Sequence, residues 1–396
     1  MTHNAVSAAG GPRNVLVVMP SLRRGGAERH AVLMVTTMDR SRWTPHVLAF
    51  AGGPLLAELE QAGIDVTVTS TGTGLRSVPA AAKVIGELVE RLDPAVVSGH
   101  DVFVELATRA VARRRSLPLL VWKHTYGHIG YRGQREKLIE SVSGRLVTRY
   151  GAVCHTQVRY LTDQLGLDPS RIRVVANTVD PDTFVPPSAG TPADNTPADN
   201  TPADNTAADN TVPTVAMVAA MRADKGHHTA LTAWVEVSRA LPHARLVLAG
   251  DGPLRAEYEA FTRELGIDES VEFLGEVADP QAVIRRADLL LLASYTIECF
   301  PYVGLEAMAL ARPMVSTDIG GLPEMVDDGV TGRLVPPQDP GALAAALIHA
   351  LGDRAGTVEQ GRAARRRLDS VFPFQRWQDQ VEELLTEVAS ATEESA

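Results

Sequence analysis

The sequence is poor in cysteine and has no long apolar run. Its two cysteines, Cys154 and Cys299, are far apart in the chain, which predicts free thiols in a reducing compartment rather than a disulfide framework. No apolar stretch approaches the roughly 20 residues of a membrane-spanning helix. The N-terminal residues are polar and lack the apolar core of a signal peptide. We therefore expect a cytoplasmic globular protein, in agreement with a hydrophobic content of 45%.

Basic side chains are fewer than acidic ones, 38 against 48, which gives a formal net charge of −10. Nucleic acid is therefore not an expected partner. Positive charge is nevertheless concentrated in one region, at Arg109, Arg113, Arg114, Arg115, Arg132, Arg135, Lys137, Arg145 and Arg149. Acidic residues are interspersed with it, at Glu105, Glu136 and Glu140. We expect a solvated face here rather than a membrane-binding one, with the stripe of Leu138, Val142 and Leu146 in the core.

The length of 396 residues exceeds what one hydrophobic core usually supports, which predicts two domains. A five-residue repeat, Thr-Pro-Ala-Asp-Asn, runs from Thr191 to Asn210, with Ala207 in place of proline in the last copy. Residues of these types have almost nothing to bury, so the repeat is predicted to be a disordered linker without chemistry of its own.

This linker fixes the expected domain boundaries. We place one domain at 1–186, the linker at 187–211, a second domain at 212–371 and a final segment at 372–396. The final segment contains an amphipathic helix with one apolar face, formed by Val381, Leu384, Leu385 and Val388.

Strand-length apolar runs alternate with helical periodicity in the second domain. The runs cover residues 215–220, 246–249, 271–275 and 289–292. This alternation is typical of an α/β domain with a doubly wound parallel sheet.

The first domain opens in the same way. A strand over 14–20 leads through Gly25 and Gly26 to a helix over 29–38. No G-x-G-x-x-G follows the strand, which argues against a nicotinamide or flavin enzyme. The two glycines would let the backbone approach an anionic ligand closely, although an ordinary tight turn also uses such residues.

Two glutamates, Glu298 and Glu306, follow the 289–292 strand, and Pro301 between them suits the first position of a helix. In an open α/β sheet, ligands bind at the carboxyl ends of the strands, where a helix start offers free N–H groups to phosphate. Carboxylates accept hydrogen bonds, so their natural ligands here are hydroxyls, as on a sugar and a ribose. The structural alternative is that Glu298 caps the helix and Glu306 is solvated surface.

Two cations, Arg222 and Lys225, lie at the turn that follows the 215–220 strand. This position would place them against a diphosphate. Lysine is scarce in the chain and occurs only at Lys83, Lys123, Lys137 and Lys225. An incidental role for Lys225 is therefore disfavoured.

With these segments the chain closely resembles the retaining glycosyltransferases of the GT-B fold, specifically the nucleotide-sugar-dependent family 4. The resemblance covers nearly the whole chain and rests on the order and spacing of several segments. They are 25–28, 100–101, His124, 174–180 with Phe184, Arg222 with 225–226, 250–253, 273–275, 298–306 and 320–324.

The resemblance implies an α/β protein of two doubly wound Rossmann-like domains facing a central cleft. The domain at 1–186 would bind the acceptor and the domain at 212–371 the nucleotide-sugar. The C-terminal helix would cross back to the N-terminal domain.

The resemblance also implies roles for individual residues. Glu298 would contact the transferred sugar, Glu306 the ribose, and Arg222 and Lys225 the diphosphate. The catalytic residues would be His124, Glu298, Arg222 and Lys225. The donor-binding residues would be Gly25, Gly26, Arg222, Lys225, Gly250, Gly252, Glu298, Phe300, Val303, Gly304, Leu305 and Glu306. The acceptor-binding residues would be His100, His124 and Tyr126.

One segment departs from the pattern of the family. Many members have Gly-Phe-Gly after the first glutamate, whereas this chain has Cys299, Phe300 and Pro301. Proline has no amide proton to offer, so the contact to sugar and phosphate must come from neighbouring N–H groups.

The implied reaction uses no cofactor and no metal ion, and no Asp-x-Asp motif lies near the expected site. The donor would be a UDP-linked hexose or N-acetylhexosamine. The leaving phosphate can itself accept the proton of the acceptor hydroxyl, so no general base is needed. The residues leave open whether the acceptor is a polysaccharide, a lipid-linked sugar, an aminocyclitol or another natural product, and they carry no signal for an oligomeric state.

Other functions are compatible with the same fold. A sugar-nucleotide epimerase would release free nucleotide without an acceptor. A phosphorylase would need phosphate and usually a pyridoxal-binding lysine, which the scarcity of lysine in the second domain disfavours. A non-catalytic binding partner of this fold is disfavoured because both glutamates and both cations are present.

Overall fold

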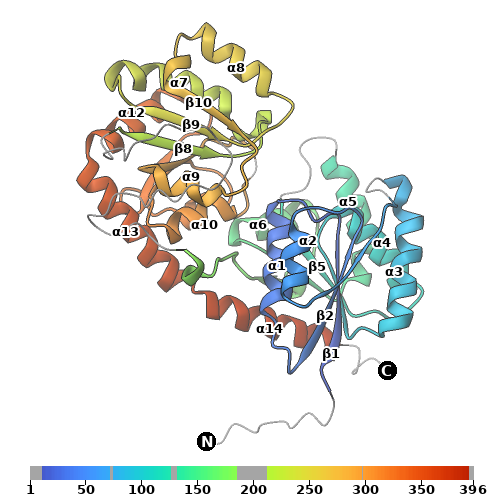
Figure 1. Cartoon of the computed structure of the whole chain (residues 1–396). Coiled ribbons are helices and arrows are strands. Elements are labelled where there is room, and N and C mark those ends of the chain that lie inside the picture. The colour runs from blue at the N-terminus through green and yellow to red at the C-terminus, as the bar shows by residue number, and fades with distance from the viewer. Residues whose placement is uncertain (1–10, 72–74, 126–131, 185–211, 297, 392–396) are drawn as a thin grey trace, which may run out of the picture. The chain divides into compact units, whose positions relative to one another are not determined.

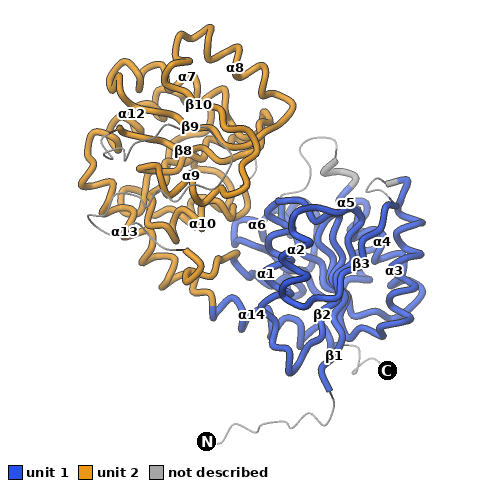
Figure 2. The backbone as a smooth tube through the Cα atoms, in the orientation of Figure 1, with its two compact units in different colours: residues 1–176, 375–396 blue, residues 177–374 orange. Residues whose placement is uncertain are grey.

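The computed structural model describes residues 11–71, 75–125, 132–184, 212–296 and 298–391. The chain divides into two compact units, residues 1–176 with 375–396 and residues 177–374 (Figure 2). Each unit is described by itself below. The predicted linker at 187–211, which contains the repeat, lies outside the described residues, as does Tyr126.

Unit 1 is built on a parallel sheet of seven strands in the order β3-β2-β1-β4-β5-β6-β7 (Figure 1). The strands are β1 (Arg13–Met19), β2 (Trp43–Ala49), β3 (Asp65–Val68), β4 (Val96–Gly99), β5 (Leu119–Lys123), β6 (Arg149–Ala152) and β7 (Ile172–Val174). The helices between them are α1 (Gly26–Thr37), α2 (Leu55–Gln61), α3 (Val78–Leu92), α4 (Val102–Ala112), α5 (Arg132–Ser143) and α6 (His155–Arg159). The order reverses between β1 and β4, which makes the carboxyl ends of these strands the topological switch point of the unit.

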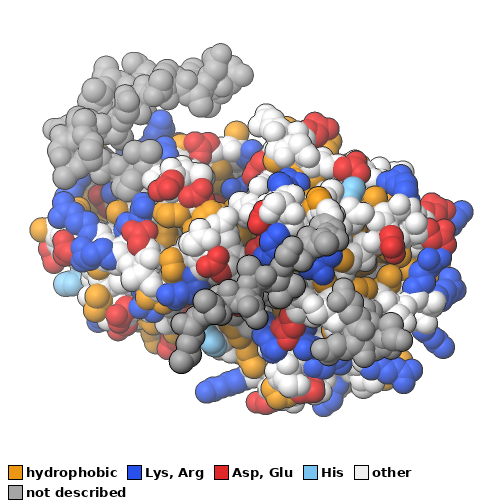
Figure 3. Space-filling model, turned by 90° about the horizontal axis from the view of Figure 1, so that it is seen from below, with side chains coloured by type: hydrophobic (Ala, Val, Ile, Leu, Met, Phe, Trp, Pro, Cys, Tyr) orange, Lys and Arg blue, Asp and Glu red, His pale blue; other side chains and the backbone are white. Residues whose placement is uncertain are grey.

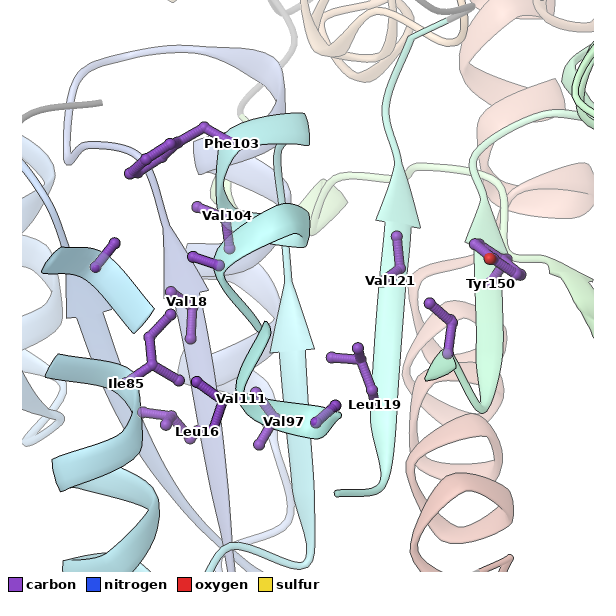
Figure 4. Close-up of a cluster of buried hydrophobic side chains, with 14 of the residues drawn as sticks. Leu16, Val18, Ile85, Val97, Phe103, Val104, Val111, Leu119, Val121 and Tyr150 are labelled. Atoms are coloured by element: carbon purple, nitrogen blue, oxygen red, sulfur yellow. The ribbon is translucent and has the colours of Figure 1, made fainter. Parts of the chain in front are cut away.

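The core of unit 1 lies between the sheet and the helices α3 and α4. Strands of a parallel sheet are covered on both faces, so β1 is an almost continuous apolar run. The side chains that fill this core are shown in Figure 4 and include Leu16, Val18, Ile85, Val97, Val104, Val111, Leu119 and Val121.

The C-terminal helix α14 (Phe374–Ser390) packs on unit 1. Its apolar face, which includes Val381 and Leu385, is buried as the sequence predicts. Glu382 accepts a hydrogen bond of 2.6 Å from Trp43 Nε1, and Glu387 accepts bonds of 2.7 and 2.6 Å from Arg149 and Arg173. The return of this helix to the N-terminal domain is therefore confirmed.

Unit 2 has a parallel sheet of six strands in the order β10-β9-β8-β11-β12-β13. Its strands are β8 (Thr214–Val218), β9 (Arg245–Ala249), β10 (Val271–Gly275), β11 (Leu289–Leu292), β12 (Met314–Thr317) and β13 (Gly332–Val335). Its helices are α7 (His227–Ala240), α8 (Arg255–Glu264), α9 (Pro280–Arg286), α10 (Tyr302–Ala309), α11 (Leu322–Met325), α12 (Pro340–Gly352) and α13 (Arg354–Val371). The switch point lies between β8 and β11, where Arg222, Lys225 and Glu298 follow the strands.

Two predicted helix starts are shifted. Pro301 is the residue before α10 rather than its first residue, because its ψ of 134° keeps it in the extended loop. Helix α1 begins at Gly26 and not at residue 29, because the chain is already helical after the extended Gly25.

The orientation predicted for α5 is wrong. Leu138 and Val142 are 63% and 65% exposed, so they are not core. Glu136 and Glu140, predicted on a solvated face, are buried, and so is Glu105 on α4. The physical reason is that Lys123 at the end of β5 takes the carboxylates of all three residues as partners.

The surface carries charges of both signs. On the face shown in Figure 3, basic and acidic side chains are interspersed rather than separated into fields. None of the helices in the described part of the chain is long and apolar enough to cross a membrane.

Candidate functional site

Glu298 is the centre of a hydrogen-bonded group at the switch point of unit 2. Its carboxylate accepts a bond of 2.5 Å from Lys225 Nζ and one of 2.6 Å from Ser294 Oγ, both at Oε1. Thr317 Oγ1 in turn donates to the backbone oxygen of Ser294 at 2.5 Å. Glu298 is only 8% exposed, so its partners fix its position before any ligand arrives.

Two glycines allow the backbone to close around this group. Gly320 has a φ of +56°, and a Cβ there would lie 2.0 Å from the backbone oxygen of Glu298. The next N–H, of Gly321, donates to that same oxygen at 2.8 Å. Gly226 has a φ of +74°, and a Cβ would lie 1.8 Å from the oxygen of Ala293. Side chains at these two positions would displace the loops that carry Glu298 and Lys225.

Arg222 is held apart from this group by a partner of its own. Its Nε and its terminal nitrogen donate to the two oxygens of Asp224, at 2.9 and 2.6 Å. These bonds from Arg222 hold the pKa of the Asp224 carboxyl below its ordinary value. The Arg222 side chain is 56% exposed, so the guanidinium is fixed in orientation yet open to solvent.

The glycines of the turn after β9 have a packing role. A Cβ on Gly250 would lie 2.1 Å from the oxygen of Ala219, and one on Gly252 would lie 2.6 Å from the oxygen of Met221. Met221 N–H also donates to Asp251 at 2.9 Å. The turn therefore supports the loop that ends in Arg222, and contact of these glycines with a donor stays a prediction.

Helix α10 follows Glu298 in the chain, and most of its side chains are buried. Phe300 is buried against Phe372, with ring centroids 5.0 Å apart, and Leu305 is fully buried. A Cβ on Gly304 would lie 2.8 Å from Met325. Val303 and Glu306 are half-buried on the same helix. The start of α10 follows the switch point, where its N–H groups suit an anion.

A group of histidines occupies the switch point of unit 1. His100 follows β4 and His124 follows β5, and His100 Nδ1 lies 3.1 Å from His124 Nε2. His100 Nε2 lies 3.0 Å from Ser98 Oγ. His30 of α1 completes the group, with its ring centroid 5.0 Å from that of His124 and 4.2 Å from that of Trp122.

Burial sets the protonation of these histidines. It lowers the pKa of His124 to about 3. Burial first, and then the neighbouring rings, hold the pKa values of His30 and His100 well below their ordinary range. All three imidazoles are therefore neutral at physiological pH.

Gly25 and Gly26, at the start of α1, are exposed. A Cβ on Gly25 would lie 2.3 Å from Glu28 Oε2, so the close approach of Glu28 explains the glycine at this position. Glu28 accepts a bond of 3.1 Å from Ser21, and burial raises its pKa. Contact of the two glycines with a ligand stays a prediction.

A buried ionic cluster forms around Lys123, the residue that precedes His124 in the chain. Lys123 Nζ donates to Glu105 at 2.7 Å, to Glu140 at 2.8 Å and to Glu136 at 3.4 Å. Arg109 bonds Glu140 at 2.8 Å and Glu105 at 3.2 Å. Burial alone would raise the pKa of Glu140, but Lys123 and Arg109 lower it to about 2. The cluster ties α4 and α5 to the end of β5.

Gln157 fixes the backbone on both sides of His124. Its Nε2 donates to the oxygen of Lys123 at 2.8 Å and to that of Thr125 at 2.9 Å. The amide is fully buried on α6. The segment that carries His124 is thus held from both sides.

Several of these residues were not expected from the sequence. Ser294, Thr317 and Asp224 are ordinary polar residues whose partners only the fold reveals. His30 was also missed, although it follows the Gly25 to Glu28 segment in the same helix and could have been grouped with the other two histidines.

The fold and the two switch-point groups define a two-domain α/β protein with a Rossmann-like architecture in each unit. Two family models match it, one for each part of the chain. The model described as Glycosyltransferase Family 4 matches residues 24–183, and that described as Glycosyl transferases group 1 matches residues 212–353. The chain belongs to the family 4 glycosyltransferases.

Curated relatives match parts of the chain. A glycogen synthase of Mycobacterium tuberculosis is 36% identical over 160 residues, which are 40% of this chain and 38% of the relative. A D-inositol 3-phosphate glycosyltransferase of Mycobacterium sp. (strain KMS) is 34% identical over 212 residues, 50% of this chain and 42% of the relative. The chain thus spans less than half the length of these relatives.

Solved structures match almost the whole chain. Anabaena Alr3699/HepE, in complex with UDP, has a TM-score of 0.76 at 21% identity, covering 94% of this chain and 99% of that one. Sucrose-phosphate synthase from Thermosynechococcus elongatus has a TM-score of 0.76 at 19% identity, covering 96% and 100%. These similarities confirm the GT-B fold.

Proposed function

We propose that the protein is a retaining glycosyltransferase. It transfers a hexose or N-acetylhexosamine from a UDP-sugar to a hydroxyl of a small-molecule, natural-product or glycan acceptor. The observation that carries this proposal is the buried Glu298, fixed by Lys225 and Ser294 at the carboxyl ends of β8 and β11. A carboxylate beside a lysine at such a point suits a ligand with hydroxyls next to a phosphate.

The charges at this point favour a donor that contains a diphosphate. Lys225 and Arg222 supply positive charge for a diphosphate, and Asp224 orients the guanidinium of Arg222. Glu298 would accept hydrogen bonds from the sugar, and Glu306 on α10 from the ribose. Support for UDP comes from the Anabaena protein, which was solved with UDP and with UDP-glucose.

In the proposed reaction, the bond between the anomeric carbon and the diphosphate oxygen breaks, and the acceptor oxygen attacks from the face that the diphosphate leaves. The acceptor proton passes to the departing phosphate oxygen. Lys225, Arg222 and the start of α10 stabilise the negative charge that develops on that oxygen. This scheme assigns charge neutralisation to the protein and places no metal ion at the diphosphate. We also assign a catalytic role to His124 of unit 1, whose imidazole is uncharged.

The two glutamates are expected to act on different steps. Glu306→Ala should weaken UDP binding by about 10- to 100-fold, since a hydrogen bond to a charged group contributes roughly 1.5–3 kcal/mol. Glu298→Ala should mainly lower turnover. Calorimetric titration with UDP, GDP, dTDP and NAD, followed by rate measurements with the matching nucleotide-sugar, checks both.

Glu236→Ala is the control, because this exposed glutamate lies on α7 in the same unit and outside the segments that carry the resemblance. It should leave UDP affinity unchanged. Equal UDP affinity in wild type and Glu306→Ala would contradict the ribose assignment, and no binding of any nucleotide to the wild type would contradict the proposed donor site.

The repeat at 191–210 is expected to contribute no chemistry. Deleting it should leave turnover within about twofold of the wild type, because its residue types have little to bury and carry no catalytic group. Steady-state rates of the two proteins under the same conditions decide this, and a large loss of activity would show that the segment has a role in the reaction.

A further inference from the structure

The histidine group of unit 1 brings together three potential metal ligands. His30, His100 and His124 come from α1 and from the segments after β4 and β5. One ring nitrogen from each lies within 4.8 Å of the other two. Because β1, β4 and β5 are neighbours in the sheet, the fold itself assembles this group.

Two of the three histidines have hydrogen-bond partners for their ring nitrogens. His100 contacts Ser98 Oγ through Nε2 and His124 through Nδ1. His30 is fully buried, yet neither of its nitrogens has a hydrogen-bond partner among the residues that the structure describes. In native proteins a buried polar group without a hydrogen-bond partner often marks a bound water or ion.

The separations suit one ion with small adjustments. Zn²⁺ binds imidazole nitrogen at about 2.0–2.1 Å in tetrahedral geometry, so two such ligands lie about 3.3 Å apart. The nitrogens of His100 and His124 are already 3.1 Å apart. All three ligand nitrogens lie within 4.8 Å of one another, so the distances from the His30 nitrogen to the other two would have to shorten by at most about 1.5 Å.

The surroundings of His100 also fit ligation. Histidine ligands usually donate their second ring N–H to an oxygen, which orients the ring. If His100 binds through Nδ1, its Nε2–H points to Ser98 Oγ at 3.0 Å. His124 is half-buried, and three histidine ligands leave the fourth position of a tetrahedral ion for water.

The geometry points to a metal site that binds a divalent transition-metal ion, namely Zn²⁺. Its ligands are His30, His100 and His124. An ion there accounts for one of the two unpaired nitrogens of His30, which hydrogen bonding among the three rings does not. The metal site is inferred from these contacts and does not depend on the proposed function. One consequence does rest on the proposed function: an ion bound to His124 would block its role in catalysis, so Zn²⁺ would inhibit transfer.

Metal binding is measured on the purified full-length protein after treatment with EDTA and removal of the chelator. Calorimetric titration with Zn²⁺ should give one equivalent per chain, and Co²⁺ should give the visible absorption of a tetrahedral nitrogen site. His30→Phe keeps an aromatic ring against Trp122 and should abolish both signals. His124→Asn, at a half-buried position, should weaken Zn²⁺ binding at least tenfold.

His243→Asn is the matched control, because His243 is exposed in unit 2. It should bind Zn²⁺ as the wild type does. Circular dichroism and thermal unfolding show whether each variant is folded. The proposal is overturned if the wild type binds no Zn²⁺, or if folded His30→Phe or His124→Asn binds it with unchanged affinity. UDP binding is measured separately, so failure of the metal site and failure of the proposed donor site remain distinguishable.

Discussion

Lys225→Ala is expected to lower kcat/KM by about 100-fold or more. The ammonium group is removed from the place where charge develops on the leaving diphosphate, and the loss of one such electrostatic contact typically costs this much. The variant also leaves Glu298 without a partner that lies 2.5 Å away in the structure. The measurement is UDP release from UDP-glucose and UDP-N-acetylglucosamine, with and without a panel of hydroxyl acceptors.

Another lysine of the chain provides a control for this experiment. Lys83→Ala removes a lysine that is 79% exposed on α3 and should leave the rate unchanged. Lys225→Arg keeps the charge and should recover part of the activity. A rate for Lys225→Ala within twofold of the wild type would contradict the role of this residue in catalysis. UDP release that does not depend on any acceptor would favour the epimerase alternative.

Lys123→Met should destabilise unit 1 by about 3–5 kcal/mol. The lysine is buried among three carboxylates, and removal of one partner of a buried ion pair leaves uncompensated charge. For a unit of this size, the loss corresponds to a fall in Tm of roughly 6–20 °C. Differential scanning calorimetry should show this shift in one transition, with little change in the unfolding of unit 2.

Lys137→Met is the control, because Lys137 is exposed on α5, and its Tm should stay within about 2 °C of the wild type. The double variant Lys123→Met/Glu105→Gln should recover part of the loss, because it removes one of the unpaired charges. Equal Tm values for Lys123→Met and the wild type would show that the cluster contributes nothing to stability.

The strands of this protein could be predicted from its sequence, whereas the pairing of buried charges could not. The apolar runs at 246–249 and 289–292 are long enough and apolar enough to identify parallel strands, and both are present as β9 and β11. In α5, however, Leu138 and Val142 have the spacing of a core stripe, yet Glu136 and Glu140 are buried instead. A local pattern does not reveal that Lys123 supplies the partner for both.

In the candidate site, too, some residues could be predicted from the sequence and others could not. Glu298 and Lys225 could be singled out because a strand, a turn and a helix start place them at a ligand-binding edge. The supporting contacts from Ser294 and Thr317, and the close approach at Gly320, depend on how β11 and β12 align and on the loop after β12. Such long-range register is not encoded in short spacing, so these residues become visible only in the fold.

The packing of α14 on unit 1 has a consequence for the order in which the chain folds during synthesis. Unit 2 is one continuous stretch, residues 177–374, whereas unit 1 also needs residues 375–396. Until that last stretch has been made, Trp43, Arg149 and Arg173 lack their partners Glu382 and Glu387. Domains generally fold as units, beginning at the N-terminus as it emerges from the ribosome. In this chain unit 1 is synthesised first but is completed last. Until α14 emerges, the apolar surface of unit 1 that α14 covers is exposed and accessible to chaperones.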